Sequence, residues 1–135
     1  MKTKQVWANL AVKNVEQTRK FYSDLGFKAN EGRQSDELAS FLVGEANFVL
    51  HFFAEDSSQF QKSINGKIAD LKQGNEVMFT LSAHSRQEVD EWADAVKAAG
   101  GTVFSEPQTI MNDSWYGCGF ADPDGHKWNV FYNGK

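Results

Sequence analysis

Residues 9–27, with the sequence NLAVKNVEQTRKFYSDLGF, decide the fold of this chain. Across residues 6–12, apolar side chains alternate with others at the two-residue period of a β-strand. Asn14 is a good helix N-cap, and Gln17 three residues later completes a capping-box pattern. Apolar residues then recur at helical spacing until Gly26, which supplies the left-handed end of the helix. The stretch therefore predicts a strand followed by a capped helix.

Three short antiparallel strands are expected after this helix, because polar or glycine-bearing turns divide the next part of the sequence into three apolar segments. These segments cover residues 27–33, 38–43 and 47–53. The first module, about residues 4–54, therefore has the order βαβββ. A polar linker of about residues 55–74 follows, and its apolar anchors recur at a spacing of roughly four, which permits a short helix.

A second module, about residues 75–133, repeats this order. Residues 76–82 alternate as a strand, Ser85 caps a helix 71 positions after Asn14, and Gly100 ends that helix. The strands expected after the helix cover residues 102–105, 115–121 and 127–132. The predicted fold class is α+β, with two βαβββ modules whose sheets form a shared cleft.

Composition excludes several classes of protein. With 135 residues, the chain is expected to form a single domain, residues 1–135, with a core of ordinary size. A net charge of -4, a pI near 5.3 and scattered basic residues argue against nucleic acid. No apolar run is long enough for a membrane span and the first residues lack the apolar stretch of a signal peptide, so we expect neither, and the lone Cys118 excludes an intrachain disulfide. We therefore expect a cytoplasmic protein in which Cys118 is a buried packing residue.

Alternation within the strands predicts which side chains face the cleft, because the helices cover the other face of each sheet. The aromatic content of 13% suits a cavity lined with rings. Glu76 is a candidate general base beside a bound substrate, and it could equally form an ion pair with His51. The candidate ligand-binding residues are Trp7, Asn9, His51, Phe53, Met78, Asn129 and Phe131.

Two stretches resemble the signatures of the vicinal oxygen chelate superfamily, which includes glyoxalase I, bleomycin-resistance proteins and extradiol dioxygenases. The first is residues 9–14, NLAVKN, leading to residues 21–22, FY, and residues 25–27, LGF. The second is residues 120–128, FADPDGHKW. The opening is most similar to the branch of predicted lactoylglutathione-lyase-like proteins. The resemblance implies two βαβββ modules, commonly assembled as a homodimer.

The same resemblance implies a metal site that takes one residue from each of four strands. The matching positions hold Trp7, His51, Glu76 and Asn129. His51 and Glu76 are good ligands and Asn129 could give a carbonyl oxygen, whereas an indole cannot coordinate a metal. His51, Glu76 and Asn129 are therefore the candidate metal ligands, in a set whose outer positions depart from the family's pattern.

Two hypotheses about function, one a binding protein and the other an enzyme, fit these residues. The first is a metal-free binder of a small, planar or aromatic molecule, in the manner of bleomycin-resistance proteins. The second is a glyoxalase-type lyase or isomerase in which nickel, zinc or iron polarises a carbonyl and Glu76 moves a proton. The missing outer ligands favour the binder, which needs no cofactor.

Overall fold

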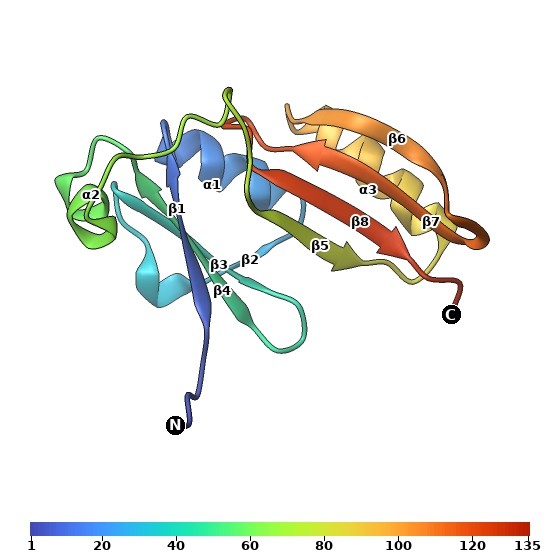
Figure 1. Cartoon of the computed structure of the whole chain (residues 1–135), viewed down its shortest axis with the longest axis horizontal. Helices are drawn as coiled ribbons and strands as arrows, with labels where there is room; N and C mark the ends of the chain where they lie inside the picture. Colours follow the sequence, from blue (N-terminus) through green and yellow to red (C-terminus); the bar gives the residue numbers. More distant parts are fainter. The chain divides into compact units, whose positions relative to one another are not determined.

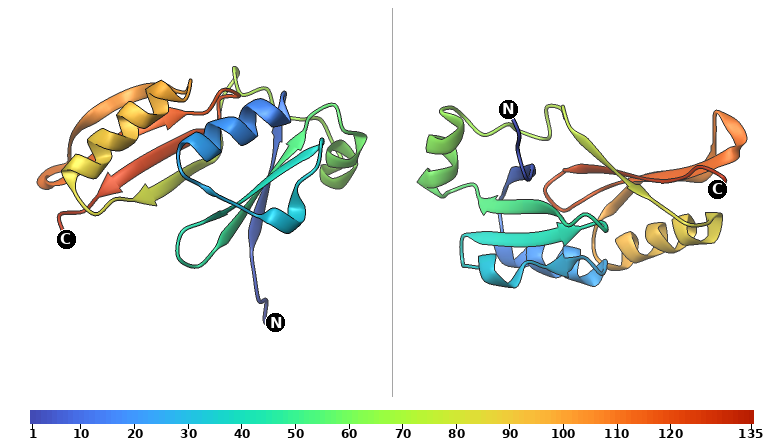
Figure 2. Two further views of the ribbon diagram at one scale, coloured as in Figure 1. Left: turned by 180° about the vertical axis from the view of Figure 1, so that it is seen from behind. Right: turned by 90° about the horizontal axis from the view of Figure 1, so that it is seen from below.

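The chain folds into two compact units, Met1–Ala69 and Asp70–Lys135 (Figure 1). This computed structural model describes residues 1–135, apart from the side chain of Asn112. Each unit has one four-stranded mixed sheet and a helix against one face of it (Figure 2), which confirms the predicted α+β class with its repeated βαβββ order. Within the described residues, no helix has the length and apolar character needed to cross a membrane.

In the first unit the strands lie in the order β1-β4-β3-β2. β1 pairs with β4 in parallel, and the remaining pairs are antiparallel. A short helix in the linker confirms the expectation from its apolar spacing. The elements are β1 (Trp7–Val12), α1 (Val15–Asp24), β2 (Lys28–Ala29), η1 (Glu31–Arg33), β3 (Leu38–Val43), β4 (Phe48–Ala54) and α2 (Ser58–Ile64).

Helix α1 begins and ends where the sequence predicts. The side chain of Asn14 accepts a hydrogen bond from the Gln17 N–H over 2.9 Å, and Gly26 has a φ of +88° just after the helix. On the buried side of the helix, the Tyr22 ring stacks on Phe52 of β4 with 4.6 Å between ring centroids. Phe52 and Tyr22 are both fully buried. This contact shows that the face of the sheet toward α1 carries the core, and that the opposite face is not covered by α1.

The predicted strand at residues 27–33 is wrong beyond its first part, because only Lys28–Ala29 pairs with β3. The Arg33 N–H donates to the Asn30 carbonyl over 2.9 Å, which closes the 3-10 turn η1. The side-chain amide of Gln34 then takes the place of a strand neighbour for Ser40. It donates to the Ser40 carbonyl over 2.7 Å and accepts from the Ser40 N–H over 3.3 Å.

The second unit repeats the topology, with strand order β5-β8-β7-β6 and a parallel β5–β8 pair. Its β6 and β7 are longer than the sequence predicts and join at a tight turn whose central residue, Met111, has a φ of +57°. β8 has the predicted bounds. The elements are β5 (Met78–Ser82), α3 (Arg86–Ala98), β6 (Thr102–Ile110), β7 (Asn112–Ala121) and β8 (Lys127–Tyr132).

A row of aromatic rings forms the core between this sheet and α3. Trp128 is 1% exposed and lies parallel to Phe120, with ring centroids 6.0 Å apart and planes 4° apart. The Trp128 ring also contacts Phe79 of β5 at 4.9 Å, and Trp92 of α3 stacks on Phe120 at 6.3 Å. Since alternate strand residues point to opposite faces, Asn129 and its neighbours are left on the face away from α3.

The turn at residues 122–125 joins β7 to β8 and carries part of the closing signature. Asp122 is 4% exposed, and its Oδ1 accepts hydrogen bonds from the backbone N–H groups of Asp124 and His126, at 3.0 and 2.9 Å. Gly125 has a φ of +98°, which favours glycine. This turn sets where β8 begins, and therefore where β5 can begin to pair with it.

Candidate functional site

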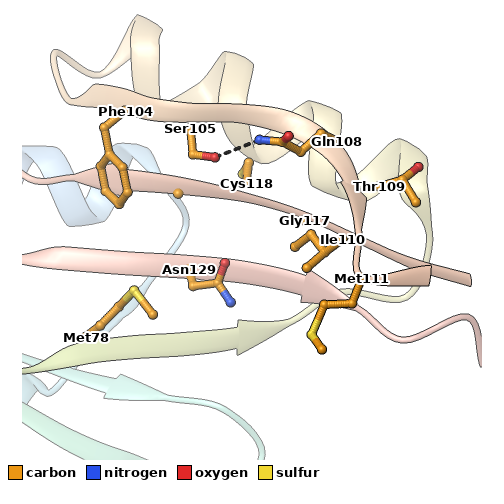
Figure 3. A pocket seen from close by; sticks show the side chains of 11 residues that line it. Met78, Phe104, Ser105, Gln108, Thr109, Ile110, Met111, Gly117, Cys118 and Asn129 are labelled. Atoms are coloured by element: carbon orange, nitrogen blue, oxygen red, sulfur yellow. Dashed lines mark hydrogen bonds between the residues drawn. The ribbon is translucent and has the colours of Figure 1, made fainter. Parts of the chain in front are cut away.

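A pocket of about 420 Å³ lies on the face of the second sheet that α3 does not cover (Figure 3). Four of its lining residues are large and apolar, and three of these side chains, Met78, Phe104 and Met111, are among the most exposed apolar groups of the chain. The apolar residues are Met78, Phe104, Ile110 and Met111; the polar ones are Ser105, Gln108, Thr109 and Asn129; and Gly117, Cys118 and Gly119 line the rest.

Two glycines of β7 allow side chains of β6 to pack across that strand. A Cβ atom on Gly119 would be only 2.6 Å from Cε1 of Phe104, and a Cβ on Gly117 would be 2.8 Å from Cδ1 of Ile110. Real Cβ atoms essentially never approach other atoms so closely. Phe104 and Ile110 can therefore cross β7 only because both positions lack a side chain.

Cys118, between the two glycines, points to the opposite face. Its Sγ lies 3.9 Å from the Val89 carbonyl of α3, and the residue is 2% exposed. Burial, then the negative charges of Glu106 and Asp90, raise the pKa of the Cys118 thiol to about 11. The predicted packing role of Cys118 is confirmed, and a thiol held in this form is a poor nucleophile.

An irregularity in β6 brings a second amide to the pocket. The pairing of β6 with β7 shifts between Ser105 and Gln108, where the segment contains Pro107, which has no N–H to donate to a ladder. The side-chain amide of Gln108 donates to Ser105 Oγ over 3.0 Å and to the Glu106 carbonyl over 3.3 Å. These two bonds hold the Gln108 amide at the wall of the pocket.

Asn129 stands on β8, and its carboxamide projects among the lining side chains (Figure 3). Its neighbours across the sheet are Thr80 on β5 and Gly119 on β7. Lys127 is next to the pocket without lining it, and its ammonium nitrogen lies 4.6 Å from the centroid of the Phe104 ring. The pocket thus offers an apolar wall and neutral hydrogen-bonding groups.

His51 occupies the corresponding strand of the first unit. It is 6% exposed and lies between Asn9 on β1 and Ser40 on β3, with the Phe53 ring edge-on at 5.7 Å. Its Nδ1 is buried without a hydrogen-bond partner among the described residues. Burial first, and the positive charge of Arg33 second, lower the pKa of His51 below 6.5, its ordinary value. The imidazole is therefore held in its neutral form.

This lowered pKa predicts a stability that falls with acid. Between the folded and unfolded pKa values of His51 the unfolded chain binds the additional proton, so the contribution to stability is present above about pH 6.5 and is lost as the pH falls through that value. In urea titrations between roughly pH 7.5 and pH 5, the free energy of unfolding should fall less steeply for His51→Gln than for the unmodified chain. Equal slopes for His51→Gln and the unmodified chain would contradict the assignment.

The predicted site residues are placed here within each unit by itself. Met78 and Asn129 meet in the pocket, whereas Phe131 lies on the same face with its ring edge-on to Trp115 at 5.5 Å. Trp7, 51% exposed, begins β1. Asn9, His51 and Phe53 lie on the face of the first sheet away from α1.

Glu76 lies outside the sheet, because β5 begins at Met78 and the predicted strand at residues 76–82 started two residues too early. The side chain of Glu76 is exposed. Trp7 and Met78 are the first residues of equivalent strands and are separated by the same 71 positions as the helix caps Asn14 and Ser85. Met78, and not Glu76, is therefore the counterpart of Trp7.

The donor atoms at the four equivalent strand positions do not fit a divalent metal ion. An indole has no donor for a metal, the thioether of Met78 is soft, and the neutral amide of Asn129 is a weak ligand, so His51 alone is a strong one. Across the described side chains, no three His, Cys, Asp or Glu residues gather into a group that could hold a metal. No chemical step is therefore assigned to a metal in this chain.

Sequence reasoning missed most of the pocket. Phe104 lies in the predicted strand at residues 102–105 but was not predicted to line a site, Gln108 and Ile110 lie beyond the predicted end of that strand, and the two glycines were not singled out. The sequence does contain a pattern that marks the two glycines. Gly117 and Gly119 alternate in a strand pattern, which leaves one face of that strand bare.

Comparisons with known proteins agree with this architecture. A family model described as the glyoxalase/bleomycin resistance protein/dioxygenase superfamily matches residues 4–130. A hypothetical protein from S. aureus is similar at 30% identity and a TM-score of 0.81, covering 98% of this chain and 95% of its own. A comparison with curated proteins gives no match.

Two solved structures at lower identity show the fold alone. A glyoxalase-related enzyme from Fulvimarina pelagi has 20% identity and a TM-score of 0.81, with coverage of 97% of this chain and 89% of that one. A lactoylglutathione lyase from Agrobacterium tumefaciens has 21% identity and a TM-score of 0.68, with coverage of 98% and 95%.

Proposed function

The chain belongs to the glyoxalase/bleomycin resistance protein/dioxygenase superfamily, and on that premise we propose that it binds a small, planar, uncharged molecule in the pocket over β7 without using a metal ion. The observation that carries this proposal is the pocket itself. An apolar wall lies beside bare backbone, and the free neutral amide of Asn129 stands within it.

The shape and chemistry of the lining support a planar and neutral ligand. Its volume of about 420 Å³ suits a molecule of a few fused rings. The Phe104 ring offers a face or an edge for aromatic contact. Cys118 is the one lining residue with an ionisable side chain, and its thiol points away toward α3. No charged group of the lining would compensate a charged ligand for the hydration it loses, and the nearby Lys127 ammonium already lies against the Phe104 ring.

The metal-dependent alternative gains no support from this geometry. A lyase or isomerase with Glu76 as general base would need that carboxylate beside the substrate, but Glu76 is exposed and does not line the pocket. The weak donor set described above also favours binding without a metal. Assembly as a homodimer in the cytoplasm, which the sequence predicts, stays a prediction for size-exclusion chromatography and cell fractionation.

A titration with naphthalene, followed by saturation-transfer nuclear magnetic resonance, tests the proposal. Phe104→Ala removes the ring from the wall and should weaken binding about threefold to tenfold, because an aromatic contact contributes about 0.5–1.5 kcal/mol. Ile64→Ala in α2 is the matched control, since Ile64 is 47% exposed and Phe104 is 49% exposed. The control should leave binding unchanged.

The same titration after dialysis against a chelator tests the metal. Binding should be unaffected by the chelator. If binding were lost and then restored by nickel, zinc or iron, the metal-free proposal would be overturned. If Phe104→Ala bound naphthalene as well as the unmodified chain, the pocket would not be the site.

A further inference from the structure

The carboxamide of Asn129 projects into the pocket and makes no hydrogen bond within the described part of the chain. Gly119, its neighbour on β7, has no side chain that could cover it. Gln108 differs, because its amide nitrogen already donates to two acceptors within the protein.

A free carboxamide presents a donor and an acceptor side by side. Its N–H and C=O groups match the C=O and N–H groups of a cis amide, so the two can form a pair of parallel hydrogen bonds. Asn and adenine pair in the same way through two adjacent atoms of the base edge. A ring fixes an amide in the cis form, so a cyclic amide presents this edge without first rearranging.

We propose that Asn129 recognises the amide edge of a planar lactam, which makes cyclic amides the ligand class of this pocket. This inference rests on the proposed function, because it assumes that the pocket over β7 binds a planar molecule. A carboxylate would offer acceptors only and would carry a charge into an uncharged lining, and a hydrocarbon such as naphthalene can occupy the pocket but pairs with neither Asn129 group.

The second amide of the pocket supports the same class. Since the Gln108 nitrogen donates to Ser105 and Glu106, the Gln108 carbonyl oxygen remains as an acceptor at the β6 wall. The pocket therefore offers this acceptor as well as the Asn129 carbonyl, which suits a ligand that carries N–H groups. Lactams and cyclic ureas have such groups, whereas lactones do not.

The test compares quinolin-2(1H)-one with coumarin by isothermal titration calorimetry. The two molecules have the same shape, and the ring N–H of the lactam is a ring oxygen in the lactone. The lactam should bind the unmodified chain about tenfold more tightly, because the lactone leaves the Asn129 carbonyl unpaired. In Asn129→Leu this preference should disappear. Asn133→Leu, near the C-terminus, should retain it.

Each outcome separates the inference from the proposed function. If both molecules bind equally well and Phe104→Ala weakens both, the lactam inference is overturned and the planar-ligand pocket remains. A preference for the lactam that survives Asn129→Leu also overturns the inference. If neither molecule nor naphthalene binds, the proposed function fails as well. Thermal denaturation of each variant shows whether it is folded before its binding is compared.

Discussion

Trp128→Ala is expected to lower the free energy of unfolding by about 3–5 kcal/mol, the usual cost of deleting a buried aromatic ring. Trp128 is 1% exposed and lies in the middle of the aromatic row that joins β5, β8, β7 and α3. Its removal would leave a cavity against both Phe79 and Phe120. Urea denaturation followed by circular dichroism gives the measurement, since fluorescence would change with the loss of the indole itself.

Two variants keep this prediction testable. Total stability is commonly about 5–15 kcal/mol, so Trp128→Ala could unfold the second unit altogether. Trp128→Phe keeps most of the ring contacts and should cost clearly less than the alanine variant. Trp7→Ala removes an indole that is 51% exposed and should change stability by less than about 0.5 kcal/mol. A similar cost for Trp7 and Trp128 would show that the aromatic row is not the core.

Gly117→Ala and Gly119→Ala should have different consequences, although the two glycines are only two residues apart on β7. A Cβ on Gly117 would be 2.7 Å from the backbone oxygen of Val130 on β8, so the sheet itself must move. We expect a loss of about 1–3 kcal/mol in the free energy of unfolding. A Cβ on Gly119 would meet the end of the Phe104 side chain, which is 49% exposed and can swing away.

Gly119→Ala should therefore change stability by less than about 1 kcal/mol and should weaken binding of a planar ligand roughly fivefold or more. The new methyl group would stand directly beside Asn129 and would displace the ring that forms the pocket wall. Urea denaturation and the naphthalene titration measure the two effects on the same samples. If Gly119→Ala unfolds the chain, or if Gly117→Ala leaves the free energy of unfolding unchanged, then Gly117 and Gly119 do not form the floor of the pocket beneath Ile110 and Phe104.

Local signals predicted the elements that depend on local chemistry. Asn14 and Ser85 cap their helices as expected, and the strands Leu38–Val43 and Lys127–Tyr132 have the predicted bounds. The apolar period of a strand and the preference of a cap residue are both properties of neighbouring residues, so they can be recognised before the chain folds.

Elements that depend on a distant partner were predicted less well. β5 begins at Met78 because its partner β8 begins at Lys127, after the turn at residues 122–125. Just before β5, the Asn75 side chain donates to the Gly125 carbonyl over 2.9 Å, so this segment caps the turn and does not extend the sheet. Glu76 alternates correctly with its neighbours, but nothing in its local sequence shows where the partner strand stops.

The pocket could not be predicted from the sequence for the same reason. Its wall depends on the shifted pairing between Ser105 and Gln108, and its floor depends on which side chains of β6 cross Gly117 and Gly119. Both are contacts between strands. Alternation, which is local, did place Asn129 on the face of the second sheet away from α3.

Because Cys118 is buried, the rate at which its thiol is alkylated reports how often the second unit opens. The thiolate is the form that reacts with alkylating reagents, and this thiol is 2% exposed with a pKa of about 11. A reagent can modify it only in the moments when α3 separates from β7. Because the chain has no other cysteine, each labelled molecule records one such opening. Comparing the labelling rate with and without a ligand therefore measures how far the ligand slows the local opening of the second unit.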